Sequence, residues 1–390
     1  MNSTHLLEAR SVVAFAVLAL ACDCKAVPPP VTLPPKPPET VAAPPPTSAP
    51  APPSDLRRGI NLGNALDAPS EGEWGVTLAA SDFVDVKQAG FDHVRLPARF
   101  SGHALEKAPF TIEPAFLSRV DWAIDEALAN GLAVIIDLHH YELLMTDPED
   151  NRARFVGLWS QIAEHERARP ANVVFELCNE PTAPLTADLW NTIMGDALRV
   201  VRTSNPTRRL VLEGVDWASA KNLRDTLAIP VGDPNIVGSF HMYQPILFTH
   251  QGADFMPSEW ETTGVVFPGP PAQPIQPGPH ALNKGWVSDW FRRYNEEPAA
   301  RNPSGPATID NQLDVAQNFA ERTHVPVYMG EFGVIEYADA ASRAAWIRMT
   351  REGAERRGFG WAYWDDGGKF KIYGRASRKW NDALLGALLH

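Results

Sequence analysis

From Asp55 onward, apolar runs of strand length alternate with amphipathic runs of helical length. The strand-like runs are Arg58–Leu62, His93–Pro97, Ala133–Leu138, Val173–Leu177, Arg209–Glu213, Ile236–Phe240, Pro326–Met329 and Phe359–Tyr363. The helix-like runs between them include Ala80–Gln88, Ala115–Ala129, Asn151–Glu166, Ala187–Val201, Asp310–Thr323 and Ala338–Arg356. Repeated strand–helix units predict a parallel sheet covered by helices. Eight units in about 335 residues predict a closed α/β barrel of the (β/α)8, or TIM, type, with any active site at the C-terminal ends of its strands.

The main alternative fold is an open, doubly wound sheet. Such sheets usually carry a glycine-rich phosphate-binding turn after the first strand. Here the turn after the first strand is Gly63-Asn64-Ala65, and no such motif follows. The pattern therefore favours the barrel.

The connection between the sixth and seventh strand candidates, residues 242–310, is much longer than the others. It contains two Pro-rich pieces, Pro268–Pro279 and Pro298–Pro306, and an aromatic piece, Trp286–Tyr294. A loop of this length in a compact domain is usually functional. We expect it to form one wall of a cleft; the alternative is a surface elaboration without ligand contact, and the role of residues 265–306 stays open.

The first 54 residues have a different composition. In residues 1–26, Arg10 precedes an apolar run of about eleven residues, which is typical of an export signal and too short to span a bilayer. The sequence before Cys22 loosely resembles a lipoprotein cleavage site, so lipid attachment at Cys22 is an alternative to free secretion. Residues 27–54 are mostly Pro, Ala, Thr, Val and Ser and predict an extended spacer, or else an inert tail. The catalytic domain is then expected at 55–390.

Composition narrows the possible partners. The chain of 390 residues is 44% apolar and 21% charged, which is enough for a large core. Its net charge of −12 argues against nucleic acid and anionic membranes as partners and fits a neutral substrate. Of 3 Cys, only Cys178 lies in the predicted domain, so a disulfide framework is excluded there. We interpret Cys178 as a small buried strand residue rather than a nucleophile.

Two glutamates follow strand-like runs in the same way. The fourth run ends in Asn179-Glu180-Pro181, and the seventh ends in Gly330-Glu331-Phe332-Gly333. Proline provides no backbone N–H and favours an extended residue before it, so we expect Glu180 in extended backbone where the buried strand stops. Two carboxylates at strand ends of one barrel are the arrangement that glycoside hydrolysis needs.

Polar and aromatic residues stand at the predicted end of every other strand as well. They are Asn61, Asn64 and Asp67 after the first, Arg95 in the second, Asp137, His139, His140 and Tyr141 around the third, Trp217 after the fifth, His241 and Tyr243 after the sixth, and Trp364 after the eighth. Adjacent His139 and His140 should point to opposite sides of a strand and so not bind one ion, unless the strand has ended there. No His-x-x-x-His pair is present, so we expect no metal site. A serine hydrolase is disfavoured because the chain has no Gly-x-Ser-x-Gly elbow.

These segments, in this order and spacing, resemble glycoside hydrolase family 5, the family of endoglucanases and mannanases. The segments that carry the resemblance are Gly59–Leu66, His93–Pro97, Asp137–Tyr141, Asn179–Pro181, His241–Tyr243, Gly330–Gly333 and Trp361–Trp364, and together they cover nearly all of the predicted domain. The segment Phe248–Ala253 is similar to bacterial endoglucanases of the family, some of which accept mannan.

The resemblance implies catalytic roles for five residues. Glu331 would attack the anomeric carbon, and Glu180 would act first as acid and then as base, in retaining chemistry that places the two carboxyl groups about 5–5.5 Å apart. Arg95 would keep Glu331 ionised, and Tyr243 would orient it. Asn179 would bind the sugar 2-OH, a contact that strengthens in the transition state.

The resemblance also implies substrate-binding residues. His139 and His241 would flank the site and tune Glu180, and Trp364 would stack on the sugar at the cleavage point. The non-reducing side would be lined by Asn64, Asp67, His140 and His250, and Trp217 is a candidate platform, as are Trp260, Trp286 and Trp290, each of which could equally be core. Asp67 is shorter than the glutamate typical of close relatives, which puts the outer sugar contact in doubt.

Three functions stay in consideration. The first is a secreted, monomeric, cofactor-free retaining endo-β-1,4-glucanase acting on cellulose or β-glucan. The second is a mannanase or a mixed enzyme that also takes glucomannan or xyloglucan, since glucose and mannose differ only at the 2-OH. The third is a carbohydrate-binding barrel without activity, whose expected signature, loss of a catalytic carboxylate, is not seen at Glu180 or Glu331.

Overall fold

The computed structural model describes residues 53–365 and 367–390. The predicted export signal, Cys22, and the predicted spacer except its last two residues lie outside the described residues. Among the described helices, none combines the length and the apolar character needed to cross a lipid bilayer.

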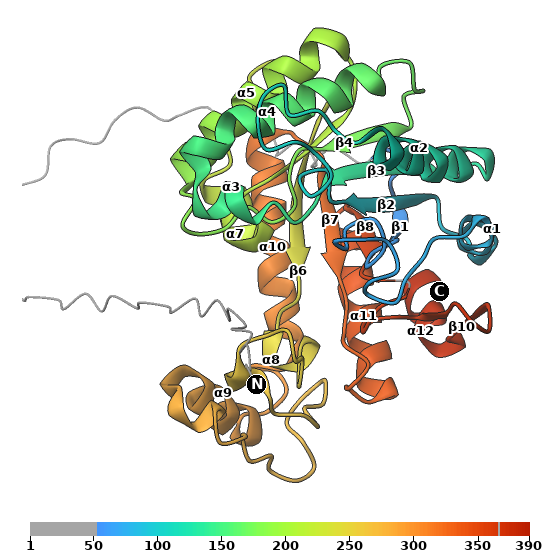
Figure 1. Ribbon diagram of the computed structural model, residues 1–390. Helices are drawn as coiled ribbons and strands as arrows, with labels where there is room; N and C mark the ends of the chain where they lie inside the picture. The colour runs from blue at the N-terminus through green and yellow to red at the C-terminus, as the bar shows by residue number, and fades with distance from the viewer. Residues whose placement is uncertain (1–52, 366) are drawn as a thin grey trace, which may run out of the picture. The chain divides into compact units, whose positions relative to one another are not determined.

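Eight parallel strands form a closed barrel in chain order (Figure 1). The strands are β1 (Arg58–Asn61), β2 (His93–Ala98), β3 (Ala133–Leu138), β4 (Val173–Glu176), β5 (Leu210–Glu213), β6 (Ile236–Met242), β7 (Val327–Phe332) and β8 (Gly360–Tyr363). The barrel closes because β8 pairs with β1, with Gly59 opposite Ala362. The predicted (β/α)8 fold is therefore confirmed, with β6 and β7 extending further than the sequence pattern indicated.

Helices connect the strands and cover the barrel. They are α1 (Ala80–Ala89), α2 (Pro114–Ala129), α3 (Glu142–Thr146), α4 (Pro148–His165), α5 (Ala187–Ser204), α6 (Val215–Ala218), α7 (Ala220–Asp225), α10 (Pro306–Thr323), α11 (Ala340–Arg356) and α12 (Asp382–Leu389). A short hairpin of β9 (Tyr373–Gly374) and β10 (Lys379–Trp380) precedes α12. The main apolar core lies between strands and helices, where side chains such as Phe83, Trp159 and Trp346 are fully buried.

The interior of the barrel has two layers of different chemistry. Ile135, Val174 and Val211 belong to a compact apolar cluster that fills one layer. Two residues further along the same strands stand Asp137, Glu176 and Glu213, all buried. Because strand side chains alternate between faces, residues i and i+2 face the same way. A charged layer thus follows the apolar one toward the C-terminal ends of the strands.

The long connection after β6 is folded rather than a plain loop. It contains α8 (Ile246–Thr249), the 3₁₀ turns η1 (Ser258–Trp260) and η2 (Ala281–Asn283), and α9 (Gly285–Glu296), and it lies beside the C-terminal end of β6 (Figure 1).

The early part of this connection reaches the residues predicted to form the site. Ala253 packs against Ile335, and Tyr243 and Trp364 pack on the same cluster. That the connection forms one wall of a cleft stays a prediction. The later part contains α9, whose Val287, Phe291 and Tyr294 belong to the main apolar core.

Candidate active site

The two predicted carboxylates meet at the C-terminal rim of the barrel. Glu331 is the last residue but one of β7, and Glu180 follows β4. One carboxylate oxygen of each, together with a ring nitrogen of His241, lie within 4.8 Å of one another. Two side chains that are 151 positions apart in the sequence therefore face a common point.

The backbone at Glu180 differs from the prediction. Glu180 has a φ of +48°, in the left-handed region, rather than the extended conformation that a following proline favours. The Glu180 N–H donates a 2.8 Å hydrogen bond to Glu213 Oε2. A tertiary bond thus overrides the local preference, at a conformation that costs of order 1–3 kcal/mol and is typical of functional sites.

A β-bulge brings His241 and Glu331 side by side. In the β6–β7 ladder Phe240 is opposite Met329, but the next pair is His241 with Glu331, so the register shifts by one residue. The skipped residue is Gly330, where an added Cβ would come within 2.9 Å of Ser239 Oγ and 3.1 Å of His241 Nε2. Bulges of this kind re-aim side chains near active sites.

Glu331 is buried and held from two sides. Arg95 Nη1 donates to Oε1 at 2.7 Å, and the Tyr243 hydroxyl donates to Oε2 at 2.7 Å. Burial raises the pKa of the Glu331 carboxyl group, while His241, Arg95 and the Tyr243 hydroxyl favour its ionised form and limit that rise. Its two oxygens are therefore fixed in one orientation.

Arg95 is the centre of the charged layer. It is fully buried, and it donates two hydrogen bonds to Glu176, at 2.9 and 2.7 Å, and one to Asn179 Oδ1 at 2.8 Å. Its Nη2 also lies 2.7 Å from Asp137 Oδ2. Burial opposes the charge, but Asp137, Glu176 and Glu331 outweigh it and raise the pKa of Arg95 well above its usual value. The planar guanidinium thus ties Asn179 and the nucleophile candidate to the barrel wall.

His241 lies between three carboxylates. Its Nδ1 is 2.8 Å from Glu180 Oε1 and 3.6 Å from Glu331 Oε2, and its Nε2 is 2.9 Å from Glu213 Oε1 at ion-pair distance, though outside hydrogen-bond geometry. Burial disfavours an imidazolium, but Glu213 and Glu331 outweigh burial and raise the pKa of His241 well above its usual value. Burial acts against ionisation of Glu213, but His241, Arg95 and the Glu180 N–H together outweigh it and lower the pKa of that carboxyl group to about 2.

Glu176 and Glu213 were not singled out by the sequence analysis, and Asp137 was noted without a role. Burial raises the pKa of Glu176 to about 8 and that of Asp137 to about 7, with Arg95 acting against both rises. The sequence did contain a signal. Each residue is a lone acid inside a buried apolar strand, and an unpaired buried charge costs too much to occur without a partner.

The third strand end is arranged differently from the expectation. β3 stops at Leu138, so His139 and His140 do not alternate across a strand, and their rings lie 4.5 Å apart at 84°. His139 Nδ1 bonds Asp137 Oδ1 at 3.0 Å, and burial lowers the pKa of His139 well below its usual value. His140 Nε2 is 3.9 Å from Asp67 Oδ2, and burial lowers the pKa of His140 to about 3.

Asp67 is completely buried and only half satisfied. Its Oδ1 accepts a 2.8 Å hydrogen bond from the Ala65 N–H, whereas its Oδ2 has no hydrogen-bond partner among the described residues. Burial raises the pKa of Asp67 to about 7. The neighbouring Asn64 donates to Asp365 rather than to Asp67. A buried oxygen without a hydrogen-bond partner is costly, because the desolvation of the carboxyl group is then not compensated.

Aromatic side chains surround the carboxylate pair. The Trp364 indole lies parallel to the His139 ring, at 4° and a centroid distance of 5.8 Å. Gly63 leaves room for it, because an added Cβ would come within 2.7 Å of Trp364 Cη2. His250 is buried with its Nδ1 3.0 Å from Thr249 Oγ1, next to Tyr243 at 4.9 Å between ring centroids, and burial lowers its pKa to about 3.

The candidate platforms divide into exposed and packed ones. Trp217 is 47% exposed. Its backbone N–H donates a 3.3 Å hydrogen bond to the carbonyl oxygen of Pro181, which places it directly beside the Glu180 segment. Trp286 is also exposed. Trp260 and Trp290 are half-buried and pack against the core. The exposed Trp74, which no sequence argument selected, contacts His140 edge-on at 5.4 Å.

Three groups of possible metal ligands occur near the rim. They are Asp67 with His139 and His140, Glu176 with Glu213 and His241, and Glu180 with His241 and Glu331. In the last two groups His241 is the common member, and it lies at ion-pair distance from Glu180, Glu213 and Glu331.

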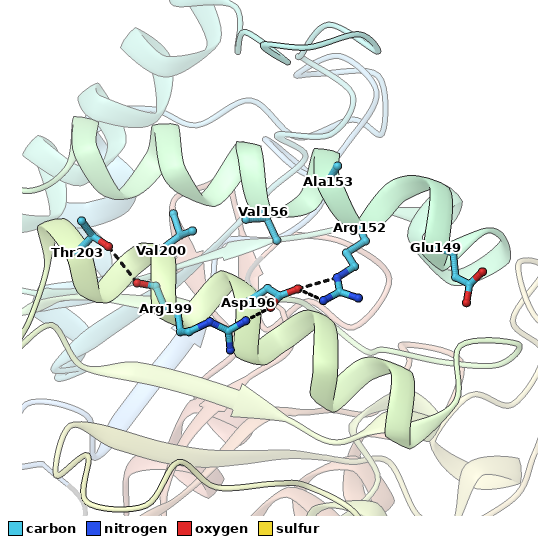
Figure 2. A pocket seen from close by; sticks show the side chains of 8 residues that line it. All are labelled: Glu149, Arg152, Ala153, Val156, Asp196, Arg199, Val200 and Thr203. Atoms are coloured by element: carbon cyan, nitrogen blue, oxygen red, sulfur yellow. Dashed lines mark hydrogen bonds and ion pairs between the residues drawn. The ribbon is translucent and has the colours of Figure 1, made fainter.

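A separate hollow lies between α4 and α5 (Figure 2). It is lined by Glu149, Arg152, Ala153, Val156, Asp196, Arg199, Val200 and Thr203. Arg152 and Arg199 both pair with Asp196, which leaves the charges in it largely satisfied (Figure 2). It is built by helices and contains none of the rim residues.

A TIM barrel with a close pair of carboxylates at its C-terminal rim has the architecture of a barrel glycoside hydrolase. The sequence profile of the family described as Cellulase (glycosyl hydrolase family 5) matches residues 62–369. The chain belongs to this family.

Individual relatives agree with the family. Endoglucanase H of Acetivibrio thermocellus is 31% identical over 338 residues, which are 85% of this chain but only 32% of that relative. Endoglucanase C of the same organism is 27% identical and is covered over 91% of its length, with 80% of this chain. The structure of Thermotoga maritima Cel5A in complex with mannotriose has 34% identity and a TM-score of 0.74, covering 86% of this chain and 97% of that one.

Proposed function

We propose that this protein is a retaining endo-β-1,4-glucanase. The observation that supports it most is the separation of the carboxylates, with one oxygen of Glu180 and one of Glu331 within 4.8 Å. Retaining glycosidases place the two groups about 5–5.5 Å apart, whereas inverting enzymes need about 6.5–9.5 Å to admit a water. The endoglucanase names of similar proteins support a β-1,4-glucan as substrate.

Glu331 is proposed as the nucleophile because both of its oxygens are held in place at the rim. Arg95 and the Tyr243 hydroxyl bind one oxygen each, and these contacts, together with His241, favour the ionised form against the effect of burial on its pKa. Attack on the anomeric carbon forms a glycosyl–enzyme ester, and the leaving oxygen takes a proton from Glu180. Glu180 then removes a proton from the water that hydrolyses the ester. The Glu180 side chain is 27% exposed, so it can exchange protons with solvent between the two steps.

The other rim residues are proposed to bind the sugar chain. Arg95 holds Asn179 by its oxygen, which leaves the amide N–H₂ as donor for the 2-OH. Trp364 offers an aromatic face at the cleavage point, and Trp217 offers one further along the chain. On the non-reducing side we place Asn64, Asp67, His140 and His250.

The test uses purified protein and barley β-glucan. Glu331→Ala and Glu180→Ala are expected to remove nearly all reducing-end release while circular dichroism shows that both variants stay folded. Normal turnover by either variant would refute the proposal. Glycan binding by a wild-type protein that releases no reducing ends would instead indicate a binding barrel.

A mixed glucanase and mannanase is the second candidate. It is favoured by the similarity to Cel5A of Thermotoga maritima, whose structures include complexes with mannotriose and with cellobiose. Parallel assays on carboxymethylcellulose, β-glucan, xyloglucan and glucomannan decide between the two. The proposed chemistry needs no metal or cofactor, and a single chain contains all of the proposed site residues. The absence of a cofactor and the monomeric state both stay predictions.

Export of the chain is also part of the proposal, on the basis of the sequence of residues 1–26. Fractionation of cells that express the full chain is expected to find it outside the cytoplasm, and deletion of residues 1–26 is expected to retain it inside. Cys22→Ala separates lipid attachment from free secretion, since only a lipid-attached protein would change from membrane-bound to released.

A further inference from the structure

Glu213 is a buried acid that the chemistry described so far does not use. It is the last residue of β5, it is 1% exposed, and the three residues before it in the strand are apolar. Placing a carboxylate in such a position costs several kcal/mol unless it is paired and hydrogen-bonded. Its contacts show what it is paired with.

Both oxygens of Glu213 lead to Glu180. Oε2 accepts the 2.8 Å hydrogen bond from the Glu180 backbone N–H. Oε1 lies 2.9 Å from His241 Nε2, and the opposite ring nitrogen of His241 lies 2.8 Å from Glu180 Oε1. Backbone, side chain, imidazole and carboxylate thus form a closed ring of contacts. Glu213 contacts the Glu180 backbone directly and reaches the Glu180 carboxyl group through His241.

Glu213 is itself held rigidly. Its carbonyl accepts a 2.8 Å hydrogen bond from Trp190 Nε1, and its Oε1 accepts one from the Ser239 hydroxyl at 3.1 Å. The next residue, Gly214, lies so close to the α7 backbone that a Cβ would come within 2.8 Å of the Asn222 carbonyl carbon. A side chain anchored in this way can impose a position on its neighbours.

The contact with the Glu180 N–H has a specific consequence. Glu180 adopts a φ of +48°, which is costly for a residue other than glycine. The hydrogen bond to Glu213 stabilises this conformation, and the conformation directs the side chain toward Glu331. Without it, the preference of a residue before proline for extended backbone would turn the Glu180 side chain away.

We propose that Glu213 is a positioning residue for general acid–base catalysis, which holds the Glu180 backbone directly and the Glu180 carboxyl group through His241. This inference rests on the proposed function. As Glu180 transfers its proton to the leaving oxygen, the His241 N–H that faces Glu180 Oε1 stabilises the carboxylate that forms. Glu213 fixes that imidazole and, by its charge, contributes most to the raised pKa of His241. The remaining charged groups of the layer are Arg95, Asp137, Glu176 and Glu331.

The test compares two substrates whose leaving groups differ in how much protonation they need. Dinitrophenyl cellobioside departs with little protonation, whereas phenyl cellobioside needs a general acid, and kcat/KM reports the first, bond-breaking step for both. Glu213→Gln keeps the shape of the side chain but presents an amide N–H₂ to either the Glu180 N–H or His241. We expect kcat/KM to fall about 100-fold on phenyl cellobioside, in the range of a lost general acid, and less than about threefold on dinitrophenyl cellobioside.

Two further variants keep the result interpretable. Ser239→Ala removes one anchor of Glu213 Oε1 but leaves in place the two contacts that lead to Glu180, so we expect the same selectivity to a much smaller degree than in Glu213→Gln. Glu213→Asp keeps the charge and shortens the side chain, and it is expected to show the same selectivity to a smaller degree. If Glu213→Gln does not fold, Glu213→Asp replaces it as the test variant.

Several outcomes would overturn the proposal. An equal loss on both cellobiosides would mean that Glu213 is only a structural acid, and no loss on either would mean that it is dispensable. If Glu180→Ala shows the selective loss and the Glu213 variants do not, the positioning role fails while the proposed function stands. If the wild type cleaves neither cellobioside and no β-glucan, both fail together.

Discussion

Replacing Arg95 by lysine tests whether the charged layer supports the site. Arg95 donates five hydrogen bonds, two to Glu176 and one each to Asn61, Asn179 and Glu331. A lysine ammonium has three donors, so at least two acceptors lose their bond inside a dry environment. Hydrogen bonds to charged groups contribute about 1.5–3 kcal/mol each, so we expect Arg95→Lys to lower the free energy of unfolding by about 3–6 kcal/mol.

Urea denaturation at neutral pH, followed by tryptophan fluorescence, measures this loss. The matched control is Arg99→Lys, which makes the same change at a rim ion pair with Glu142, whose side chain is 62% exposed. There we expect a change within about 0.5 kcal/mol, because exposed pairs contribute little. If Arg95→Lys lowers the free energy of unfolding by less than about 1 kcal/mol, or by no more than Arg99→Lys does, the hydrogen bonds of Arg95 in the charged layer do not stabilise the barrel.

Three other substitutions test separate parts of the account. Tyr243→Phe removes the 2.7 Å hydrogen bond to Glu331. We expect kcat/KM on β-glucan to fall about tenfold and the acidic limb of its pH profile to move to higher pH, because loss of this donor raises the pKa of Glu331. An unmoved acidic limb would contradict this. Asp67→Asn removes a carboxyl group whose pKa burial raises to about 7. The folded protein keeps this proton up to about pH 7, whereas the unfolded chain loses it near pH 3.8, so the stability contributed by Asp67 is complete below pH 3.8 and is lost as the pH rises to about 7. The free energy of unfolding of the wild type minus that of the variant should therefore fall by up to about 4 kcal/mol over that window, and a constant difference would refute the reasoning. Trp217→Ala removes an exposed platform; we expect unchanged thermal unfolding and a roughly tenfold higher KM on long β-glucan, with little effect on cellobiosides, and a large loss of stability would show that Trp217 is core instead.

The sequence predicted those features that repeat locally. Strands and helices were found because their apolar positions follow periods of 2 and 3.6, and Glu180 and Glu331 stood out because each follows an apolar run directly. The partners of the charged layer could not be found in this way. Glu176 reads as one acid in a short strand, and the guanidinium that binds it is 81 residues away.

The error at Glu180 has the same origin. The rule for residues before proline is local, and it predicts extended backbone. The bond that reverses it comes from Glu213, 33 residues further along the chain. Asp67 and His140 were expected together on one side of the site, but His139 and His140 were expected to alternate across a strand. The end of β3 at Leu138, directly before the histidine pair, is decided by the barrel and could not be read from the local pattern.

The central claim is that the Glu331 carboxylate forms a covalent bond to the sugar. A dinitrophenyl cellobioside with fluorine in place of the hydroxyl next to the anomeric carbon slows the second step more than the first, so the ester accumulates. Mass spectrometry of the digested protein is expected to find one added cellobiosyl group, on the peptide containing Glu331, and none in Glu331→Ala. A label on Glu180, or an unlabelled enzyme that releases the α-anomer, would contradict the account.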